Sequence, residues 1–340
     1  MKYTNIPILM YHDLSEVNNP WCVPPDEFKQ QMRWLRDNGY KTISLAQLKK
    51  GIGENRETTE KLVVLTFDDA RQGVSQHAAP ILYGYNFTAT VFVVPAWVGS
   101  KDIPVEEAYS QFMSWADLKK CLERGFDIGS HGYSHRNLME LSEEQVRQEL
   151  EQADNEIIAR LNVKPRHFAY PFGKYSQSVV VAACTRYETA VTIQRGFLRE
   201  PGRFARQWVT RSTSLAEFQR LLQKPRCSVC MIVKDEEQFL GDCLASVQGI
   251  ADEVIVVDTG STDRSKDIAR QFTDKVYDFP WNDDFAAARN ESLNYATGDW
   301  ILVMDADEVL AAEDLEAILE AINDWRIAGY QILTRNYSND

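Results

Sequence analysis

The sequence predicts an α/β protein with two successive domains in which parallel strands alternate with helices. Short apolar runs rich in β-branched residues recur along the chain, and amphipathic stretches separate them. The alternation begins again after residues 223–226, which form a linker because Pro225 cannot continue the preceding helix. Such alternation is typical of a parallel sheet, either a barrel or a doubly wound sheet. The 340 residues leave room for one domain at 1–222 and a second at 227–340.

The first domain shows strands and helices in regular succession. The run Lys61–Phe67 is apolar and β-branched without Gly or Pro, which indicates a buried strand. Ser142 and Gln145 form a capping box that begins a long helix. We expect strands at Ile6–Tyr11, Lys61–Phe67, Thr88–Val94, Asp127–Ser130 and Phe168–Tyr170. We expect helices at Pro25–Asn38, Ser114–Arg124, Ser142–Leu161 and Leu215–Gln223, and a further helix that ends near Gly84.

The second domain repeats the same rhythm. Cys227 and Cys230 have the spacing of half a zinc or redox site, but no second pair accompanies them, so buried strand thiols are the favoured interpretation. We expect strands at Cys227–Val233, Glu253–Val257, Lys275–Tyr277, Trp300–Met304 and Gly329–Leu333, and helices at Glu236–Val247, Thr262–Phe272, Phe285–Ala296 and Glu313–Asn323.

The negative charge of the chain is concentrated in its last third. From Arg226 onward there are 9 basic and 24 acidic residues, whereas the remainder carries a net charge of +2. This balance argues against nucleic acid or an anionic membrane as a partner of the second domain. The apolar run at the N-terminus is short and contains Pro7, so we expect no signal peptide, and no stretch reaches the ~18 apolar residues of a membrane span. We therefore expect a reduced, cytoplasmic protein, with the inner face of the membrane as the alternative location.

Two carboxylates directly follow the strand Lys61–Phe67. Asp68 and Asp69 would need partners once they lose water, and a metal ion is the simplest partner. Asp69, His131 and His135 can supply one oxygen and two nitrogens, which suits Zn²⁺ or a similar ion with one position open for water. Asp68 would then stand beside the ion as a free base, as in metal-assisted hydrolysis. The alternatives are an acidic surface loop and two solvated histidines.

Several motifs in order along residues 6–222 carry a family resemblance. The chain resembles the polysaccharide deacetylases, the carbohydrate esterase family 4 or NodB-homology group, in VVLTFDDA (63–70), ATVFVVP (89–95), SWADLKKCLERGFDIGSHGYSH (114–135) and FAYPFGKY (168–175). The resemblance implies a distorted (β/α) barrel that removes N-acetyl groups from glycans.

Site residues follow from this resemblance. Asp68 matches the catalytic base of the family, and Asp69, His131 and His135 match its metal ligands. The resemblance implies Zn²⁺ as the metal, with Co²⁺ or Ni²⁺ as alternatives. The backbone N–H of Phe172 would help to hold the tetrahedral oxyanion.

The N-terminus resembles the permuted poly-N-acetylglucosamine deacetylases. No histidine follows His167, so His12 in Met10-Tyr11-His12 takes the place of the general acid; the alternative is a strand-end histidine bonded to a carbonyl. Ala169 replaces the arginine that orients the base in the family, and Arg206 is expected to take over that role unless it is a surface residue. Ala70 stands where the family commonly has Gly.

The second domain resembles the family 2 glycosyltransferases of the GT-A (Rossmann-like) type over residues 226–340. The resemblance lies in VVDTGSTD (256–263), WNDDFAAARN (281–290) and MDADE (304–308). It implies that Asp258 contacts the nucleoside, Asp305 the nucleotide-sugar and Asp307 a Mg²⁺ or Mn²⁺ ion. Such domains normally continue with an acceptor site and a catalytic base, which have no counterpart in this sequence, so we expect a partial domain.

The leading hypothesis is a metal-dependent de-N-acetylase acting on N-acetylhexosamine glycans, fused to a donor-binding region of a glycosyltransferase. The first alternative is a longer glycosyltransferase with an auxiliary deacetylase-like domain. The second is a non-catalytic module that binds sugars or nucleotides. Without an expected signal peptide, a lipid-linked or intracellular saccharide is favoured over an extracellular polymer.

Overall fold

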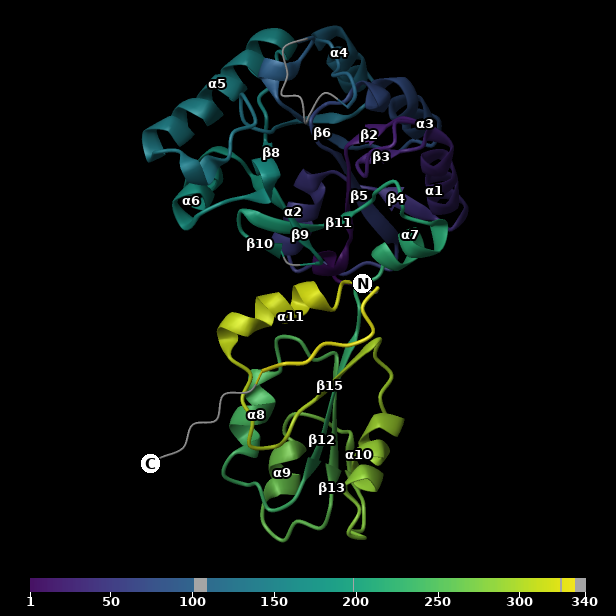
Figure 1. The fold of residues 1–340 in the computed structure, drawn as a ribbon, viewed down its shortest axis with the longest axis vertical. Helices are drawn as coiled ribbons and strands as arrows, with labels where there is room; N and C mark the ends of the chain where they lie inside the picture. Colours follow the sequence, from purple (N-terminus) through teal and green to yellow (C-terminus); the bar gives the residue numbers. More distant parts are fainter. Residues whose placement is uncertain (101–108, 198, 325, 334–340) are drawn as a thin grey trace. The chain divides into compact units, whose positions relative to one another are not determined.

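The computed structural model describes residues 1–100, 109–197, 199–324 and 326–333 (Figure 1). The chain divides into two compact units, Met1–Lys224 and Pro225–Asp340, and the boundary falls inside the proline-containing stretch 223–226. None of the helices in the described ranges is long and apolar enough to cross a bilayer.

The first unit is a closed barrel of seven parallel strands. β1 pairs with both β5 and β11, which closes the strand order β1-β11-β9-β8-β7-β6-β5 into a ring. β4 extends the sheet beside β5, and β10 pairs with β11. The strands of this sheet are β1 (Ile8–Tyr11), β4 (Tyr40–Thr42), β5 (Lys61–Phe67), β6 (Thr90–Val93), β7 (Asp127–Ser130), β8 (His167–Ala169), β9 (Thr189–Arg195), β10 (Arg199–Glu200) and β11 (Arg203–Trp208); β2 (Asp13–Leu14) and β3 (Cys22–Val23) form a separate pair. The barrel expected from the family resemblance is thus confirmed.

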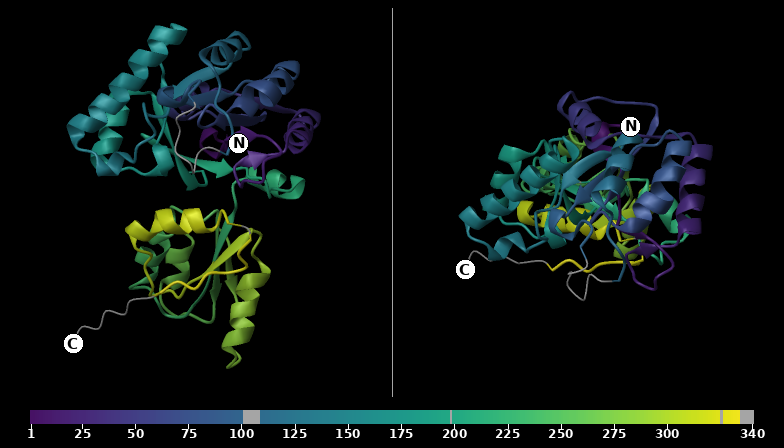
Figure 2. Two further views of the ribbon diagram at one scale, coloured as in Figure 1. Left: turned by 45° about the horizontal axis from the view of Figure 1, so that its top comes forward. Right: turned by 90° about the horizontal axis from the view of Figure 1, so that it is seen from above.

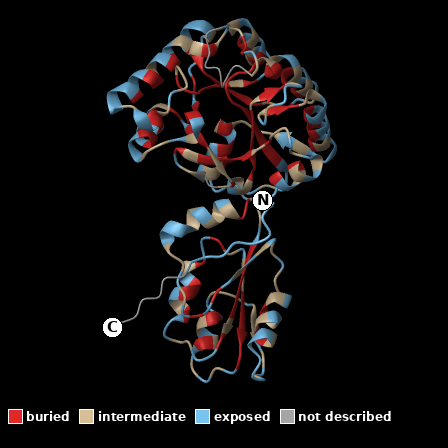
Figure 3. Ribbon diagram, viewed as in Figure 1, coloured by how far each residue is buried: buried red, intermediate tan, exposed pale blue. Residues whose placement is uncertain are grey.

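Helices surround the strands of this unit (Figures 1 and 2). Their bounds are α1 (Pro25–Asp37), α2 (Leu45–Gly53), α3 (Ala79–Gly84), α4 (Trp115–Glu123), α5 (Glu143–Leu161), α6 (Gln177–Arg186) and α7 (Leu215–Leu221). The expected capping box at α5 is present, because Ser142 accepts from the Gln145 N–H and the Gln145 side chain accepts from the Ser142 N–H. The strands are mostly buried, whereas the helices expose their outer faces (Figure 3). This packing leaves the carboxyl ends of the strands as the place where polar side chains converge.

The second unit has a four-stranded parallel sheet in the order β14-β13-β12-β15. Its elements are β12 (Cys227–Val233), α8 (Leu240–Ser246), β13 (Glu253–Asp258), α9 (Ser265–Ala269), β14 (Val276–Asp278), α10 (Phe285–Asn294), β15 (Trp300–Val303) and α11 (Leu315–Ala321). Cys227 and Cys230 are buried in β12 as free thiols, which confirms the interpretation as core residues.

Three expectations for the second unit are wrong in extent or kind. Residues 329–333 form no strand and are exposed. α9 begins at Ser265 rather than Thr262, because Thr262 donates its N–H to Asp235 and Asp263 accepts from Glu237. The N–H groups of Glu236 and Glu237 donate to Ser265 and Asp263 in these contacts, so α8 begins only at Leu240. Loop-to-loop hydrogen bonds therefore replace the outer turns of both helices.

Candidate metal centre and active site

Asp69, His131 and His135 converge in the first unit, as the sequence predicts. One ligand atom from each residue lies within 4.8 Å of the others, and this is the only group of three potential metal ligands among the residues that the structure describes. Asp69 Oδ1 lies 3.6 Å from His131 Nε2 and 3.8 Å from His135 Nε2. Asp69 follows β5 and His131 follows β7, so the carboxyl ends of two barrel strands position the group.

The donor set fits a divalent cation. His131 Nδ1 lies 2.7 Å from the Ala169 carbonyl oxygen, which requires a proton on Nδ1 and leaves the Nε2 lone pair facing the Asp69 carboxylate. Two acceptors that face each other need a cation between them, and spacings of 3.6–3.8 Å suit ligands at about 2.0–2.2 Å from one zinc ion. Burial, assisted by the neighbouring His131, lowers the pKa of His135 to about 3, so this imidazole is neutral and able to ligate.

Arg71 is a site residue that the sequence reasoning missed. Its guanidinium is fully buried and donates from Nε and Nη2 to Asp69 Oδ2, at 3.2 and 3.1 Å. Burial by itself raises the pKa of Asp69, but Arg71 and the nearby histidines more than offset this and hold the pKa well below its usual value. Because Oδ2 is occupied by Arg71, Oδ1 is the oxygen that faces the histidines. The available signal was weak: a basic residue that follows the two carboxylates closely in the sequence.

The turn after β5 is held in an uncommon conformation. Asp69 has φ 68° and Ala70 has φ 54°, both in the left-handed region that costs non-glycine residues energy. Ala70 is the residue at which the family pattern has Gly, and the positive φ accounts for that preference. The strained backbone thus lies directly after Asp68, in the turn that carries Asp69.

Arg206 is the partner of Asp68. Its Nη1 donates to Asp68 Oδ1 and its Nη2 to Oδ2, each at 2.7 Å, and Nε donates to the Thr192 carbonyl oxygen. The alternative of a surface arginine is wrong, since Arg206 is fully buried in β11. Burial raises the pKa of Asp68, but the charge and hydrogen bonds of Arg206 outweigh it, so the pKa lies below the ordinary value. Asp68 is therefore ionised at neutral pH.

His12 lies at the end of β1 with its ring against Trp21, at a centroid distance of 4.6 Å. The strand-end alternative required a bond to a backbone carbonyl, yet the buried His12 Nδ1 has no hydrogen-bond partner in the described part of the chain. Burial lowers the pKa of His12, while the charges of Asp69 and Asp68 act in the opposite direction. The pKa of His12 therefore depends on both carboxylates as well as on burial.

Phe172 occupies the turn after β8 and lies beside the metal ligands. It has φ 57°, its side chain is 47% exposed, and its ring lies 4.4 Å from the ring of His135. Gly173 and Lys174 direct their N–H groups back to Tyr170 and Pro171 within the same turn. A hollow adjoins the Phe172 side chain, lined by Arg136, Asn137, Glu140, Leu141, Phe172 and Lys174.

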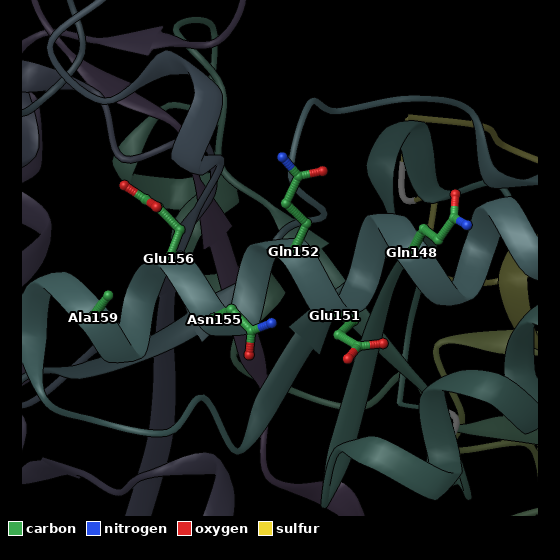
Figure 4. Close-up of a pocket in the computed structure, with 6 residues that line it drawn as sticks. All are labelled: Gln148, Glu151, Gln152, Asn155, Glu156 and Ala159. Carbon is green, nitrogen blue, oxygen red and sulfur yellow. The ribbon is translucent and has the colours of Figure 1, made fainter.

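A second hollow lies along α5 (Figure 4). It is lined by Gln148, Glu151, Gln152, Asn155, Glu156 and Ala159, all from one side of this helix. Its six residues offer no histidine, cysteine or buried charge, so we assign it no chemistry.

The second unit holds its predicted residues at the ends of two strands. Asp258 ends β13; its Oδ2 accepts from the N–H groups of Gly260 and Ser261, and its buried Oδ1 has no partner among the described residues. Asp305 and Asp307 follow β15 and are exposed. Arg289 Nη2 donates to Asp305 Oδ1 at 2.5 Å. Within the described ranges these aspartates form no three-ligand metal group.

Comparison with known families agrees with this division. The model of the family named polysaccharide deacetylase matches residues 55–189, and that of glycosyl transferase family 2 matches residues 228–340. A Bacillus subtilis protein assigned to the polysaccharide deacetylases is 31% identical over 206 residues, which are 60% of this chain and 70% of the relative. The parallel barrel, with its Asp-His-His group at the strand ends, agrees with these matches and places the first unit in the class of polysaccharide deacetylase domains. The chain belongs to the polysaccharide deacetylase family.

Other relatives match parts of the chain. The poly-β-1,6-N-acetyl-D-glucosamine N-deacetylase of Escherichia coli is 30% identical over 115 residues, 31% of this chain and 17% of the relative. An uncharacterized glycosyltransferase of Rickettsia typhi is 36% identical over 110 residues, 32% of this chain and 37% of the relative. The chain therefore spans well under half the length of these two relatives.

A solved structure resembles the first unit. The Streptococcus pyogenes deacetylase in complex with acetate superposes with a TM-score of 0.58 at 25% identity, over 64% of this chain and 98% of that chain. The similarity covers nearly the whole of that deacetylase.

Proposed function

We propose that the first unit is a metal-dependent hydrolase that removes N-acetyl groups from glycans containing N-acetylhexosamine. The observation that carries the proposal is the arrangement of Asp69, His131 and His135 beside Asp68, an ionised carboxylate held by a buried arginine. Zn²⁺ is the proposed ion, because one carboxylate and two imidazoles suit it and leave a position open. Co²⁺ and Ni²⁺ are the alternatives.

The chain's own groups perform the proton transfers. When bound, the divalent ion supplies Lewis acidity to the attacking water and to the acetyl carbonyl. Asp68 takes a proton from that water, and Arg206 fixes both oxygens of the carboxylate in the orientation for this step. Arg71 keeps Asp69 ionised and turned toward the histidines.

The remaining two groups act on the tetrahedral centre. The backbone N–H of Phe172 would donate to the oxyanion; the position of Phe172 in the turn after β8, with its ring beside that of His135, supports this role. His12, in its protonated form, donates a proton to the departing amine, which is a poor leaving group unless it is protonated. Exchange with solvent then removes the proton from Asp68 and returns one to His12, which closes the cycle. Such a donor distinguishes amide hydrolysis from the cleavage of an ester with a good leaving group.

The substrate is proposed from both site and relatives. The hollow beside Phe172 offers polar side chains next to the metal ligands for a neighbouring sugar. The Escherichia coli relative is named for N-deacetylation of a polymer of N-acetylglucosamine. The lipid-linked or intracellular saccharide and the cytoplasmic location expected from the sequence stay predictions.

A second candidate function belongs to the second unit, the binding of a nucleotide-sugar. The specific observation is Asp258 Oδ1, a buried carboxylate oxygen at the end of β13 that has no hydrogen-bond partner among the residues described by the structure; a donor on a nucleoside would satisfy it. Asp305 and Asp307 would then face the sugar diphosphate and its Mg²⁺ or Mn²⁺ ion. Isothermal titration with uridine diphosphate and Mn²⁺ tests this proposal: Asp258→Asn should weaken binding, and equal affinity of variant and wild type would refute the assignment.

Acetate release tests the deacetylase proposal. The zinc-loaded protein should release acetate and free amines from N-acetylglucosamine oligomers, and the same protein after chelation should not. The His131→Ala/His135→Ala double variant serves as the matched control, because it lacks two of the three ligands. Equal release by the chelated protein or by this variant would refute metal-dependent hydrolysis.

A further inference from the structure

The loop between the two candidate metal histidines is fastened to α5 by a buried carboxylate. Ser134 donates its backbone N–H to Glu149 Oε1 at 2.6 Å, and its hydroxyl lies 2.9 and 3.1 Å from the two carboxylate oxygens. Glu149 is only 7% exposed, although it belongs to a helix whose other glutamates are largely in water. The three short contacts join α5 to the residue directly before His135.

Glu149 differs from the other buried carboxylates of this region in its partners. Asp68 pairs with Arg206 and Asp69 with Arg71, whereas the structure records no ion pair for Glu149 among the residues it describes. Within the described ranges, the hydrogen bonds to its carboxylate come from the N–H and O–H groups of Ser134. Charge-assisted hydrogen bonds of this kind are about twice as strong as neutral ones. Burying a charge without a cation costs free energy. Packing of the core therefore does not explain why a carboxylate occupies this position.

The loop that Glu149 holds has two residues in the left-handed region. Gly132 has φ 74° and His135 has φ 58°. A side chain at position 132 would begin 3.4 Å from Glu149 Oε1 and 3.5 Å from Pro171, so the carboxylate packs directly against the loop backbone. A histidine at positive φ is strained and persists only where its surroundings enforce that conformation. The hydrogen bonds to Ser134 supply that constraint.

We propose that Glu149 is a positioning residue for the metal centre: through Ser134 it holds His135 in the conformation that ligates the ion. Glu149 itself is not a member of the three-ligand group. The inference rests on the metal site of the proposed function. Outer partners of this kind that orient a ligand typically change metal affinity 10–100-fold when they are removed.

Zinc affinity, measured by competition with a chromogenic chelator in the absence of substrate, tests the inference. Glu149→Ala should weaken zinc binding about 10–100-fold. Ser134→Ala removes the hydroxyl but keeps the N–H, so it should weaken binding less. The Ser134→Ala/Glu149→Ala variant should be no weaker than Glu149→Ala, because both changes break one connection. Glu151→Gln is the matched control on the same helix, since Glu151 contacts the exposed Arg147, and it should leave zinc affinity unchanged.

A conservative variant guards against misfolding. Glu149→Gln keeps the shape and one acceptor oxygen, so it should fold, bind zinc with intermediate affinity, and reach nearly wild-type kcat at saturating zinc. A merely structural role predicts a lower melting temperature of the zinc-free protein with unchanged zinc affinity. Zinc affinities within twofold of wild type in both Glu149 variants would overturn the inference.

The outcome is separable from that of the proposed function. If the wild type binds zinc and releases acetate while the Glu149 variants bind zinc equally well, only the inference fails. If the wild type binds zinc but releases no acetate, the deacetylase proposal fails and the zinc titrations still decide the role of Glu149. If the wild type binds none of Zn²⁺, Co²⁺ and Ni²⁺, both proposals fail.

Discussion

Arg206 and Asp68 lie 138 residues apart in the sequence and form a two-pronged ion pair inside the barrel, with both hydrogen bonds at 2.7 Å. Both side chains are almost fully buried. The pair joins β11 to the end of β5. The orientation of the proposed base therefore depends on the strand pairing that closes the barrel. Because a guanidinium matches a carboxylate with two parallel bonds, Arg206 fixes the direction of Asp68 as well as its charge.

Replacement of Arg206 by lysine should damage catalysis more than zinc binding. Lysine keeps the positive charge but cannot form both hydrogen bonds, so Asp68 loses its fixed orientation. We expect kcat for acetate release to fall at least about 10-fold, with the zinc content unchanged, because a small misplacement of a catalytic group costs up to about 10²-fold. Arg166→Lys, at an exposed pair with Glu188, is the control and should have wild-type kcat. A wild-type kcat for Arg206→Lys would contradict the role assigned to Arg206.

Replacement of His12 by glutamine should lower kcat most for substrates whose leaving group must be protonated. With N-acetylglucosamine oligomers, loss of a general acid typically lowers kcat about 10²–10⁴-fold. With 4-nitrophenyl acetate the phenolate leaves without a proton, so the His12→Gln variant should lose much less activity. The two kcat ratios, measured on the same zinc-loaded preparation, check the assignment. Equal losses on both substrates would show that His12 does not act as the acid.

His167 should make the folded state sensitive to moderate acid. It is buried beside Thr189, and burial, with the nearby Arg166, lowers its pKa to about 4 from the ordinary 6.5. The unfolded chain therefore binds more protons than the folded one between those values, so stability is full above pH 6.5 and falls as the pH drops toward 4. The His167 contribution to this loss is at most about 3 kcal/mol.

Urea unfolding at pH 7 and pH 4.5 measures the effect of His167. The difference in the free energy of unfolding between the two pH values should be smaller in His167→Gln than in wild type. An equal difference in wild type and His167→Gln would show that His167 is not buried in its neutral form.

The sequence predicts the strands that carry the site and the grouping of Asp69 with the two histidines, but it does not predict the contacts that depend on closure of the barrel. The strand Lys61–Phe67 and the strand before His131 have the expected bounds, because alternation and β-branching are local signals. Residues 171–214 were assigned no element, yet they form α6, β9 and β11 and close the barrel. The pair between Arg206 and Asp68 depends on that closure, so the sequence could only offer Arg206 as one of two alternatives.

Tertiary hydrogen bonds account for the remaining differences. The beginnings of α8 and α9 depend on contacts between two loops that lie about one strand–helix unit apart in the sequence. The role of Arg71 depends on a buried contact with Asp69 that spacing alone does not reveal. The role proposed for Glu149 likewise depends on a tertiary contact, because Ser134 belongs to the loop after β7 and Glu149 to α5.

The variant Asp68→Asn tests the central claim most directly, because it removes the proposed base and leaves the three metal ligands in place. The measurement is zinc stoichiometry together with acetate release from N-acetylglucosamine oligomers on the same protein sample. We predict that the variant binds zinc with the wild-type stoichiometry and loses at least about 10²-fold in kcat. A variant that retains zinc and releases acetate at the wild-type rate would contradict the account.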